Sequence, residues 1–151
     1  MSSGAGGDSG QARRNVELTE AAFVAFAKQG PSTVTEVLDP EVEVHSEQTM
    51  ANAGTFHGVP GYLRWSERWF EAWDEFEIVV EMIEPVGESH VVASCRQAAR
   101  GRSSGVPVEM PACYMFEISE ASVVRFHLYN TRDEAIAEAR RGEAGEPTSF
   151  G

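Results

Sequence analysis

Four long stretches of alternating apolar and polar residues follow one another in the second half of the chain, and they constrain its fold more than any other feature. The stretches are FEIVVEMIEP from Phe76, HVVASCRQAARG from His90, VPVEMPACYMFEIS from Val106 and SVVRFHLYN from Ser122. A period of two predicts β-strands, and the short turn sequences between the stretches predict antiparallel neighbours. The sequence therefore predicts a meander of long strands that forms most of one sheet.

The first half of the chain predicts helices against which this sheet can pack. In VELTEAAFVAFAKQ, which follows Asn15, the apolar residues fall on one helical stripe. A third helix, after a short one, begins at Pro60 and carries Trp65, Trp69 and Trp73 at a spacing of four. The expected role of this tryptophan row is core packing.

The remaining segments complete an α+β arrangement. We expect a short strand at 42–44, a loop over 47–58 and a last helix beginning at Thr131 or Asp133. The predicted fold is a curved, mostly antiparallel mixed sheet wrapped around the N-terminal helices, with an internal pocket. A chain of 151 residues is one domain, which we place at 15–141, between a flexible leader at 1–14 and a flexible tail at 142–151.

Charge and cysteine content exclude several functions. Lys and Arg number 12 against 24 Asp and Glu, a net charge of −12 that repels nucleic acids and anionic membrane surfaces. Two cysteines, Cys95 and Cys113, cannot complete a tetrahedral zinc site or staple a small secreted scaffold. No apolar run reaches the roughly 18 residues of a spanning helix. We expect a cytoplasmic protein without metal or cofactor.

Strand alternation assigns side chains to the two faces of the sheet. The face toward the helices is apolar, with a few polar points at Ser46, Cys95, Gln97, Tyr114 and Asn130. An apolar cleft with a few convergent polar groups is the usual form of a small-molecule site. The alternative is a filled core in which these groups bond to one another; the pocket is favoured because buried polar groups without partners are costly.

The opposite face carries Cys113, Met115, His127 and Tyr129 among charged residues. A partly apolar sheet surface of this kind suits a homodimer interface. It is equally compatible with a solvated face that has scattered apolar residues.

Four segments resemble the SnoaL-like branch of the nuclear transport factor 2-like superfamily: LDPEVEVHS at 38–46, FHGVPGYLRW at 56–65, RGRSSGVPVEM at 100–110 and VVRFHLYNTRDEAIAEA at 123–139. The resemblance implies a cone-shaped α+β barrel with a deep pocket, often dimeric through its sheet. Members include polyketide cyclases, ketosteroid isomerases and limonene-epoxide-type hydrolases, so the fold does not fix the function.

The carboxylates that serve the isomerase and epoxide-hydrolase branches are not matched. The positions that align with those branches' catalytic residues are Ala22, Ser46, Cys95, Gln97, Tyr114 and Leu128. The chain has four aspartates, Asp8, Asp39, Asp74 and Asp133, and we expect none of them on a strand.

The remaining candidates favour a cofactor-independent enzyme for a hydrophobic small molecule, acting by polyketide-type cyclisation or isomerisation. Tyr114 would donate a hydrogen bond to a carbonyl or enolate, assisted by Asn130 and Gln97, with His45 as a speculative base. The other expected ligand contacts are Phe26, Ser46, Trp69, Cys95, Met110, Phe116, Phe126 and Leu128. The alternatives are a non-catalytic binding module of the same fold and a dimerising domain without a ligand.

Overall fold

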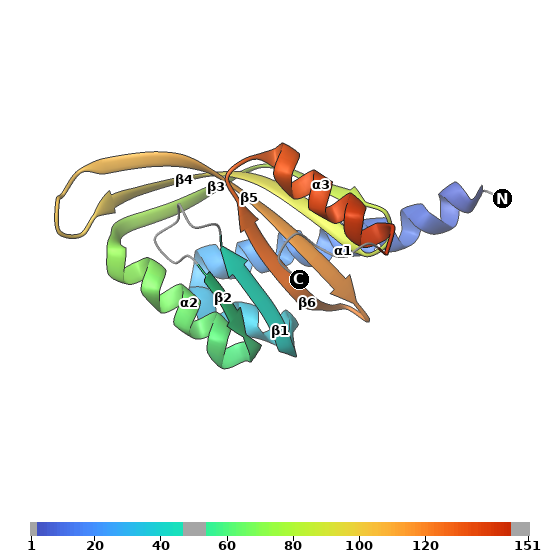
Figure 1. The fold of residues 1–151 in the computed structure, drawn as a ribbon, viewed down its shortest axis with the longest axis horizontal. Helices are drawn as coiled ribbons and strands as arrows, with labels where there is room; N and C mark the ends of the chain where they lie inside the picture. The colour runs from blue at the N-terminus through green and yellow to red at the C-terminus, as the bar shows by residue number, and fades with distance from the viewer. Residues whose placement is uncertain (1–2, 47–53, 146–151) are drawn as a thin grey trace.

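The computed structural model describes residues 3–46 and 54–145 and shows the expected α+β fold (Figure 1). In chain order, its elements are α1 Ser3–Gln29, the 3-10 helix η1 Pro31–Val37, β1 Leu38–Ser46, β2 Gly54–His57, α2 Gly58–Ala72, β3 Trp73–Val86, β4 His90–Gly101, β5 Pro107–Ser119, β6 Ser122–Tyr129 and α3 Arg132–Glu143.

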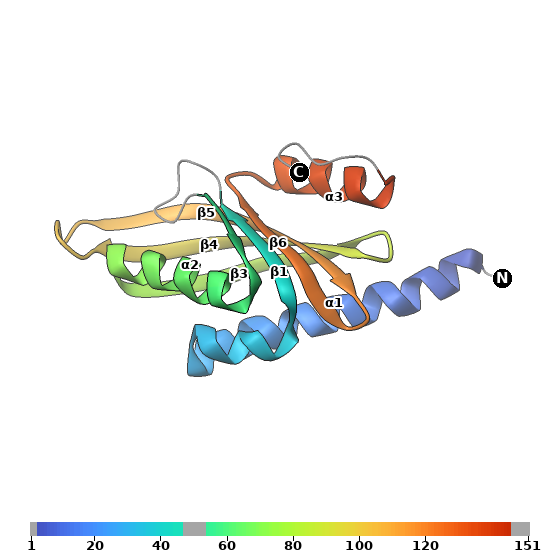
Figure 2. The same ribbon diagram turned by 60° about the horizontal axis from the view of Figure 1, so that its bottom comes forward.

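The six strands form one open, mixed sheet in the order β2-β1-β6-β5-β4-β3. Strands β3 to β6 are the predicted antiparallel meander, and β1 pairs with β6 in parallel. Helices α1 and α2 lie on one face and α3 lies on the other (Figure 2). We call these the helix side and the outer face. No helix in the described part of the chain is long and apolar enough to span a bilayer.

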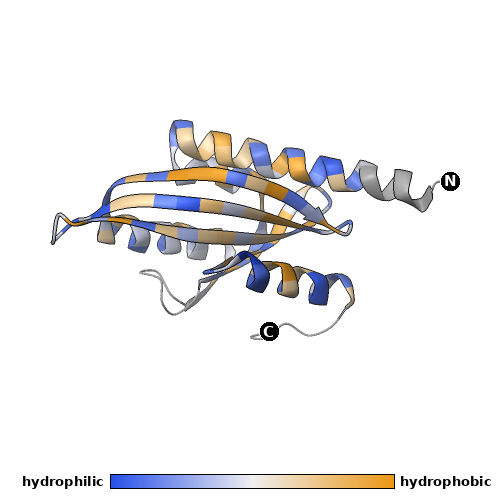
Figure 3. Ribbon diagram, turned by 90° about the horizontal axis from the view of Figure 1, so that it is seen from above, coloured by the Kyte–Doolittle hydropathy of each residue, from blue (hydrophilic) through white to orange (hydrophobic). Residues whose placement is uncertain are grey.

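The first helix is longer than the sequence predicts. It begins at Ser3, inside the segment expected to be a flexible leader, and its apolar residues lie in the C-terminal part along the sheet (Figure 3). Asn15, interpreted above as the start of the helix, does not cap it. Its amide Nδ2 donates to the Glu88 carbonyl at 2.7 Å, and Gln11 Nε2 donates to Asn15 Oδ1 at 2.8 Å.

Helix α3 reaches into the segment expected to be a flexible tail. Its predicted start is confirmed, because the Thr131 side chain accepts a hydrogen bond from the Glu134 amide. At its end, the Glu143 carboxylate accepts from the Ser89 amide at 2.9 Å and bonds His90 Nδ1 at 2.5 Å. These bonds fasten the end of α3 to the turn between β3 and β4.

Two sequence predictions on the helix side were wrong. Trp73 was expected in the third helix, but α2 ends at Ala72 and Trp73 is the extended first residue of β3. Arg102 Nη2 donates to the carbonyls of Phe70 and Trp73, where the next helical turn would begin, and so ends the helix there. Aspartates do occur in strands: Asp39 lies in β1 and Asp74 in β3. The expected loop over 47–58 also contains the strand β2, and residues 47–53 lie outside the described part of the chain.

The outer face is covered in part by the chain itself. Cys113, Met115 and Tyr129, expected at a dimer interface, are buried against α3. The residues of α3 that cover them are Ala135, Ile136 and Ala139. A period-two pattern assigns a residue to a face, but it does not say what packs on that face.

Candidate functional site

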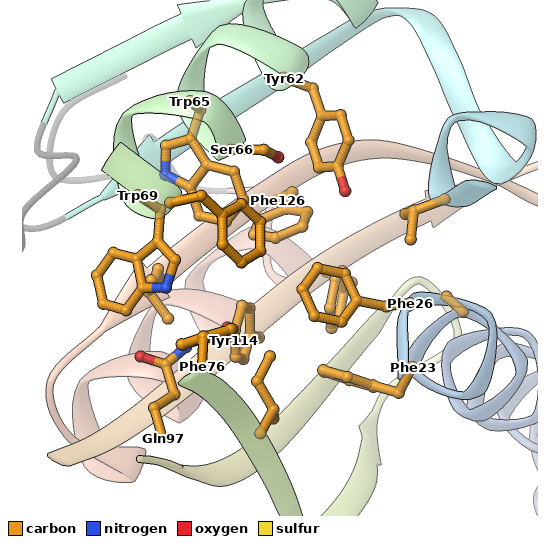
Figure 4. Close-up of a pocket in the computed structure, with 16 residues that line it drawn as sticks. Phe23, Phe26, Tyr62, Trp65, Ser66, Trp69, Phe76, Gln97, Tyr114 and Phe126 are labelled. Atoms are coloured by element: carbon orange, nitrogen blue, oxygen red, sulfur yellow. The ribbon is translucent and has the colours of Figure 1, made fainter. Parts of the chain in front are cut away.

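An aromatic cavity lies between α1, α2 and the helix side of the sheet (Figure 4). Ten of its 16 lining residues are aromatic, and none carries a charge at neutral pH. Its volume is about 50 Å³. A cavity that takes up benzene measures roughly 150 Å³, so an aromatic ligand requires side chains to move.

Three polar side chains on the cavity wall lie close together without saturating their hydrogen bonds. Gln97 Nε2 donates to the Tyr114 hydroxyl at 2.6 Å, which leaves the phenolic hydrogen free to donate elsewhere. Among the described residues, Gln97 Oε1 and Trp69 Nε1 are buried without a partner. An unpaired buried polar atom costs about 1–3 kcal/mol. These three side chains therefore offer two donors and one acceptor to a ligand, and Ser66 Oγ, which also lines the cavity without a partner, adds a hydroxyl group.

The electrostatics of this wall favour hydrogen bonding over proton abstraction. Burial raises the pKa of Tyr114 well above its ordinary value, opposed by the hydrogen bond from Gln97. Burial likewise raises the pKa of Tyr62 to about 12. Both phenols stay protonated at neutral pH, so each can donate a hydrogen bond and neither can act as a base.

Seven of the twelve expected site residues line the cavity. They are Phe26, Trp69, Gln97, Tyr114, Phe116, Phe126 and Leu128. The inward alternation predicted for the central strands places five of these correctly: Gln97 on β4, Tyr114 and Phe116 on β5, and Phe126 and Leu128 on β6.

Five expected site residues lie elsewhere. His45 points to the outer face, where its Nδ1 bonds Thr55 Oγ1 at 2.8 Å, and the pairing of β1 is regular from Glu43 to Ser46. Ser46 is buried and accepts from Trp65 Nε1 at 2.5 Å. Cys95 is in the core beside the cavity, and burial raises its thiol pKa to about 12. Met110 and Asn130 are half-buried and outside the lining.

Family comparison assigns the fold. The SnoaL-like domain family matches residues 19–126 of the sequence. The chain belongs to the SnoaL-like domain family. No curated protein matches the sequence.

Solved structures agree with this assignment at low sequence identity. A putative SnoaL-like polyketide cyclase from a Jannaschia species is 21% identical, with a TM-score of 0.68, over 85% of this chain and 92% of that one. TerC, co-crystallised with polyporic acid, is 14% identical with a TM-score of 0.69, over 82% and 98%. An NTF2-like protein from Burkholderia thailandensis is 16% identical with a TM-score of 0.71, over 87% and 97%.

Among the described residues, no carboxylate lines the cavity of this SnoaL-like fold. Asp39 accepts from the Glu41 amide at 2.8 Å, and Asp74 pairs with Arg102 at 2.8 Å. Neither residue lines the cavity. In the described ranges 3–46 and 54–145, no three His, Cys, Asp or Glu side chains are grouped so that they could hold a metal ion.

Sequence reasoning missed part of the lining. The missed residues are Ala22, Phe23, Val34, Tyr62, Trp65, Ser66, Phe70, Phe76 and Ile78. A signal was available for four of them, because Tyr62, Trp65 and Ser66 share with Trp69 the i, i+3, i+4 spacing of one helix face, and Ala22 had been aligned with a catalytic position.

Proposed function

We propose that this chain is a cofactor-independent SnoaL-like enzyme that binds an uncharged hydrophobic small molecule in the aromatic cavity. The observation that carries the proposal is the wall formed by Gln97, Tyr114 and Trp69. Its neutral donors and acceptor are buried and unsaturated, which is costly unless a ligand uses them. A charged ligand would lose its hydration without gaining a counter-ion there.

The proposed reaction is a cyclisation or isomerisation of the polyketide type. The Tyr114 hydroxyl donates to a ligand carbonyl and stabilises the negative charge of an enolate, while the aromatic walls hold a flexible chain folded. The polyketide cyclase neighbour and the small molecule bound to TerC support this class of ligand. Since no basic side chain is among the described lining residues, the proton that leaves the substrate must pass to a water molecule, and the substrate must be acidic enough for this transfer.

Binding without turnover is the second candidate, and the absence of any basic group in the lining favours it. Catalysis and binding without turnover are distinguished by incubating the protein with uncharged polyketide-type esters and following their conversion by mass spectrometry. In Tyr114→Phe, catalysis predicts a rate lower by about 10²–10³, the effect of one oxyanion donor, with binding retained. A substrate that binds and stays unchanged for the wild-type protein supports the binding module.

Occupancy of the cavity is tested with N-phenyl-1-naphthylamine, an uncharged aromatic dye that fluoresces in apolar sites. Ala22 lines the cavity from α1, so Ala22→Trp should fill the space and abolish dye binding. Ala21→Trp is the matched control on the exposed side of the same helix. Equal binding by both variants would place the dye outside the cavity and contradict the proposal.

We also propose a homodimer through the part of the outer face that α3 leaves uncovered. Val79 and Met82 of β3 pair with Arg96 and Ser94 on that face, and they are 48% and 49% exposed. Exposed apolar side chains on an open sheet favour association with a second copy. Light scattering should give twice the mass of the chain, and Met82→Glu should give the single mass. A wild-type protein of single mass contradicts the dimer.

A further inference from the structure

The mouth of the cavity can be located from the burial of its walls. Six lining residues are only half-buried: Ala22, Phe23, Phe26, Phe70, Phe76 and Ile78. All six lie on the C-terminal half of α1, the end of α2 or the beginning of β3. The other lining residues are buried. The cavity therefore meets solvent where these three elements come together.

Three phenylalanine rings close this mouth, one from each element. The ring centroids of Phe26 and Phe70 are 6.2 Å apart, those of Phe26 and Phe76 are 6.3 Å apart, and those of Phe70 and Phe76 are 5.5 Å apart. Each ring therefore contacts the other two. Because no covalent or hydrogen bond joins one ring to another, the contacts can open by side-chain rotation.

A β-bulge turns Phe76 into this cluster. The register of β3 against β4 shifts between Asp74 and Glu77, and Glu75 has φ 52° in the left-handed region. In a regular strand, Trp73 and Phe76 would face opposite sides, because they are three residues apart. With the bulge, both rings pack against Trp69, at 5.7 and 5.4 Å. Bulges frequently re-aim a side chain beside a site in this way.

Arg102 stabilises the backbone beside two of these rings, Phe70 and Phe76. Its Nη2 donates to the carbonyls of Phe70 at 2.9 Å and Trp73 at 3.1 Å, and its Nη1 pairs with Asp74 at 2.8 Å. The end of α2 and the beginning of β3 are thus joined through one side chain from the β4–β5 turn. Since the backbone is held there, the mouth must open by rotation of the phenylalanine side chains.

We propose that Phe26, Phe70 and Phe76 form an aromatic gate through which the ligand enters, with Phe76 as the residue that controls passage and Arg102 as its positioning residue. The inference rests on the proposed function of the cavity. The closed volume of about 50 Å³ requires an opening movement for any ligand with an aromatic ring. A gate of this kind admits flat rings and sets the rate at which ligand exchanges between the cavity and solvent. The polar wall behind the gate then determines which ligand is bound.

Stopped-flow fluorescence with N-phenyl-1-naphthylamine tests the gate on the full chain. Phe76→Ala should raise the association and dissociation rates together, each by about tenfold, and leave the Kd within about threefold. Phe116→Ala removes the same atoms from the buried end of the cavity, so it should change the Kd and leave the association rate within about twofold. Equal association rates for wild type and Phe76→Ala, with the dye bound by both, would overturn the gate.

Arg102→Met extends the test to the positioning residue. It should raise the association rate, whereas Arg96→Met, which removes an exposed arginine paired with Glu81 and Glu109, should not. A fall in Tm without a change in rate would show that Arg102 serves stability alone and would overturn its assigned role. If neither wild type nor Phe76→Ala binds the dye, the proposed function fails and the gate fails with it. Dye binding to Phe76→Ala alone would show that the truncation itself creates the binding space, and it would overturn the gate.

Discussion

The two faces of the sheet are built from alternate residues of the same strands, yet they are packed in opposite ways. On the outer face, Met115 is 1% exposed and fills a continuous layer under α3. His127 is also buried there, and its Nε2 bonds Glu43 at 3.1 Å. On the helix side, Gln97 is as deeply buried, but its carbonyl oxygen has no partner among the described residues and a void lies beside it.

This difference supports the proposal that the helix side holds a ligand, whereas the outer face serves packing. A core designed for stability fills its volume and pairs its polar atoms. At the cavity the helix side leaves a void beside the unpaired Gln97 Oε1 and Trp69 Nε1. The layer under α3 also has unpaired atoms, Ser94 Oγ and Glu138 Oε2, but its apolar side chains form a continuous cluster. The proposal that a ligand binds on the helix side therefore rests on the void, the unpaired atoms beside it and its closed mouth.

Truncation of the outer layer should have the largest effect on stability. Met115→Ala removes a buried side chain from a filled layer, so we expect a loss of about 2–5 kcal/mol in the free energy of unfolding. Phe70→Ala, at the half-buried mouth, should cost clearly less. Urea unfolding of both variants measures the contrast, and equal losses would break the distinction between the two faces.

The buried histidine should make the outer face sensitive to acid. Burial, followed by His45 and Arg125, lowers the pKa of His127 to about 2. The pKa of His127 in the folded protein lies below its unfolded value near 6.5. The contribution of the neutral His127 to the free energy of unfolding is therefore fully present above pH 6.5 and is lost as the pH falls toward 2. The loss between pH 7 and 5 should be at most about 2 kcal/mol, because the Glu43 carboxylate, 3.1 Å from Nε2, stabilises the protonated ring. His127→Gln should abolish that part of the slope, and an unchanged slope in this variant contradicts the assignment.

A third comparison uses two buried amides. Asn15 and Gln97 are each 2% exposed, but both amide atoms of Asn15 are bonded, whereas Gln97 Oε1 is not. Asn15→Leu should cost about 1–3 kcal/mol, while Gln97→Met should change stability by less than about 1 kcal/mol. Gln97→Met should weaken dye binding all the same. A large stability loss in Gln97→Met would mean that Gln97 is structural.

The smallest effect is expected at the ionic contact of α3. Arg132 bonds both oxygens of Glu84 at 2.7 Å, and this hydrogen bonding lowers the pKa of Glu84. The pair is partly exposed, so Arg132→Met should lower the free energy of unfolding only slightly, and high salt should remove the difference. A larger, salt-independent loss would show that the Arg132–Glu84 pair is a main attachment of α3 to the sheet.

The fold was predictable because it rests on local patterns. Alternation predicted the inward side chains of the central strands, and Thr131, one of the two expected starts of the last helix, is the residue that caps α3. The Glu75 bulge was not predictable, because no local residue preference marks a left-handed glutamate. The row of tryptophans at a spacing of four favoured a continued helix, and a tertiary contact from Arg102 ends it at Ala72.

The residues that line the cavity were predicted only in part. Tyr114 and Gln97 were identified as neutral polar groups facing the helices, but their bond depends on the pairing of β4 with β5, which places Gln97 opposite Met110 and beside Tyr114. His45 was proposed as a base from its chemistry, although its strand parity already pointed outward. The mouth depends on three elements distant in sequence, so no single pattern contains it.

The central claim is that an uncharged ligand occupies the helix-side cavity. The most direct measurement compares N-phenyl-1-naphthylamine with 8-anilino-1-naphthalenesulfonate, which has the same rings and adds a sulfonate. Both are titrated in about 0.5 M salt, which shortens the screening length to a few ångströms and so screens the chain's net charge of −12. The account predicts saturable binding of the uncharged dye alone, abolished by Ala22→Trp. Equal binding of both dyes, or binding that survives Ala22→Trp, would contradict it.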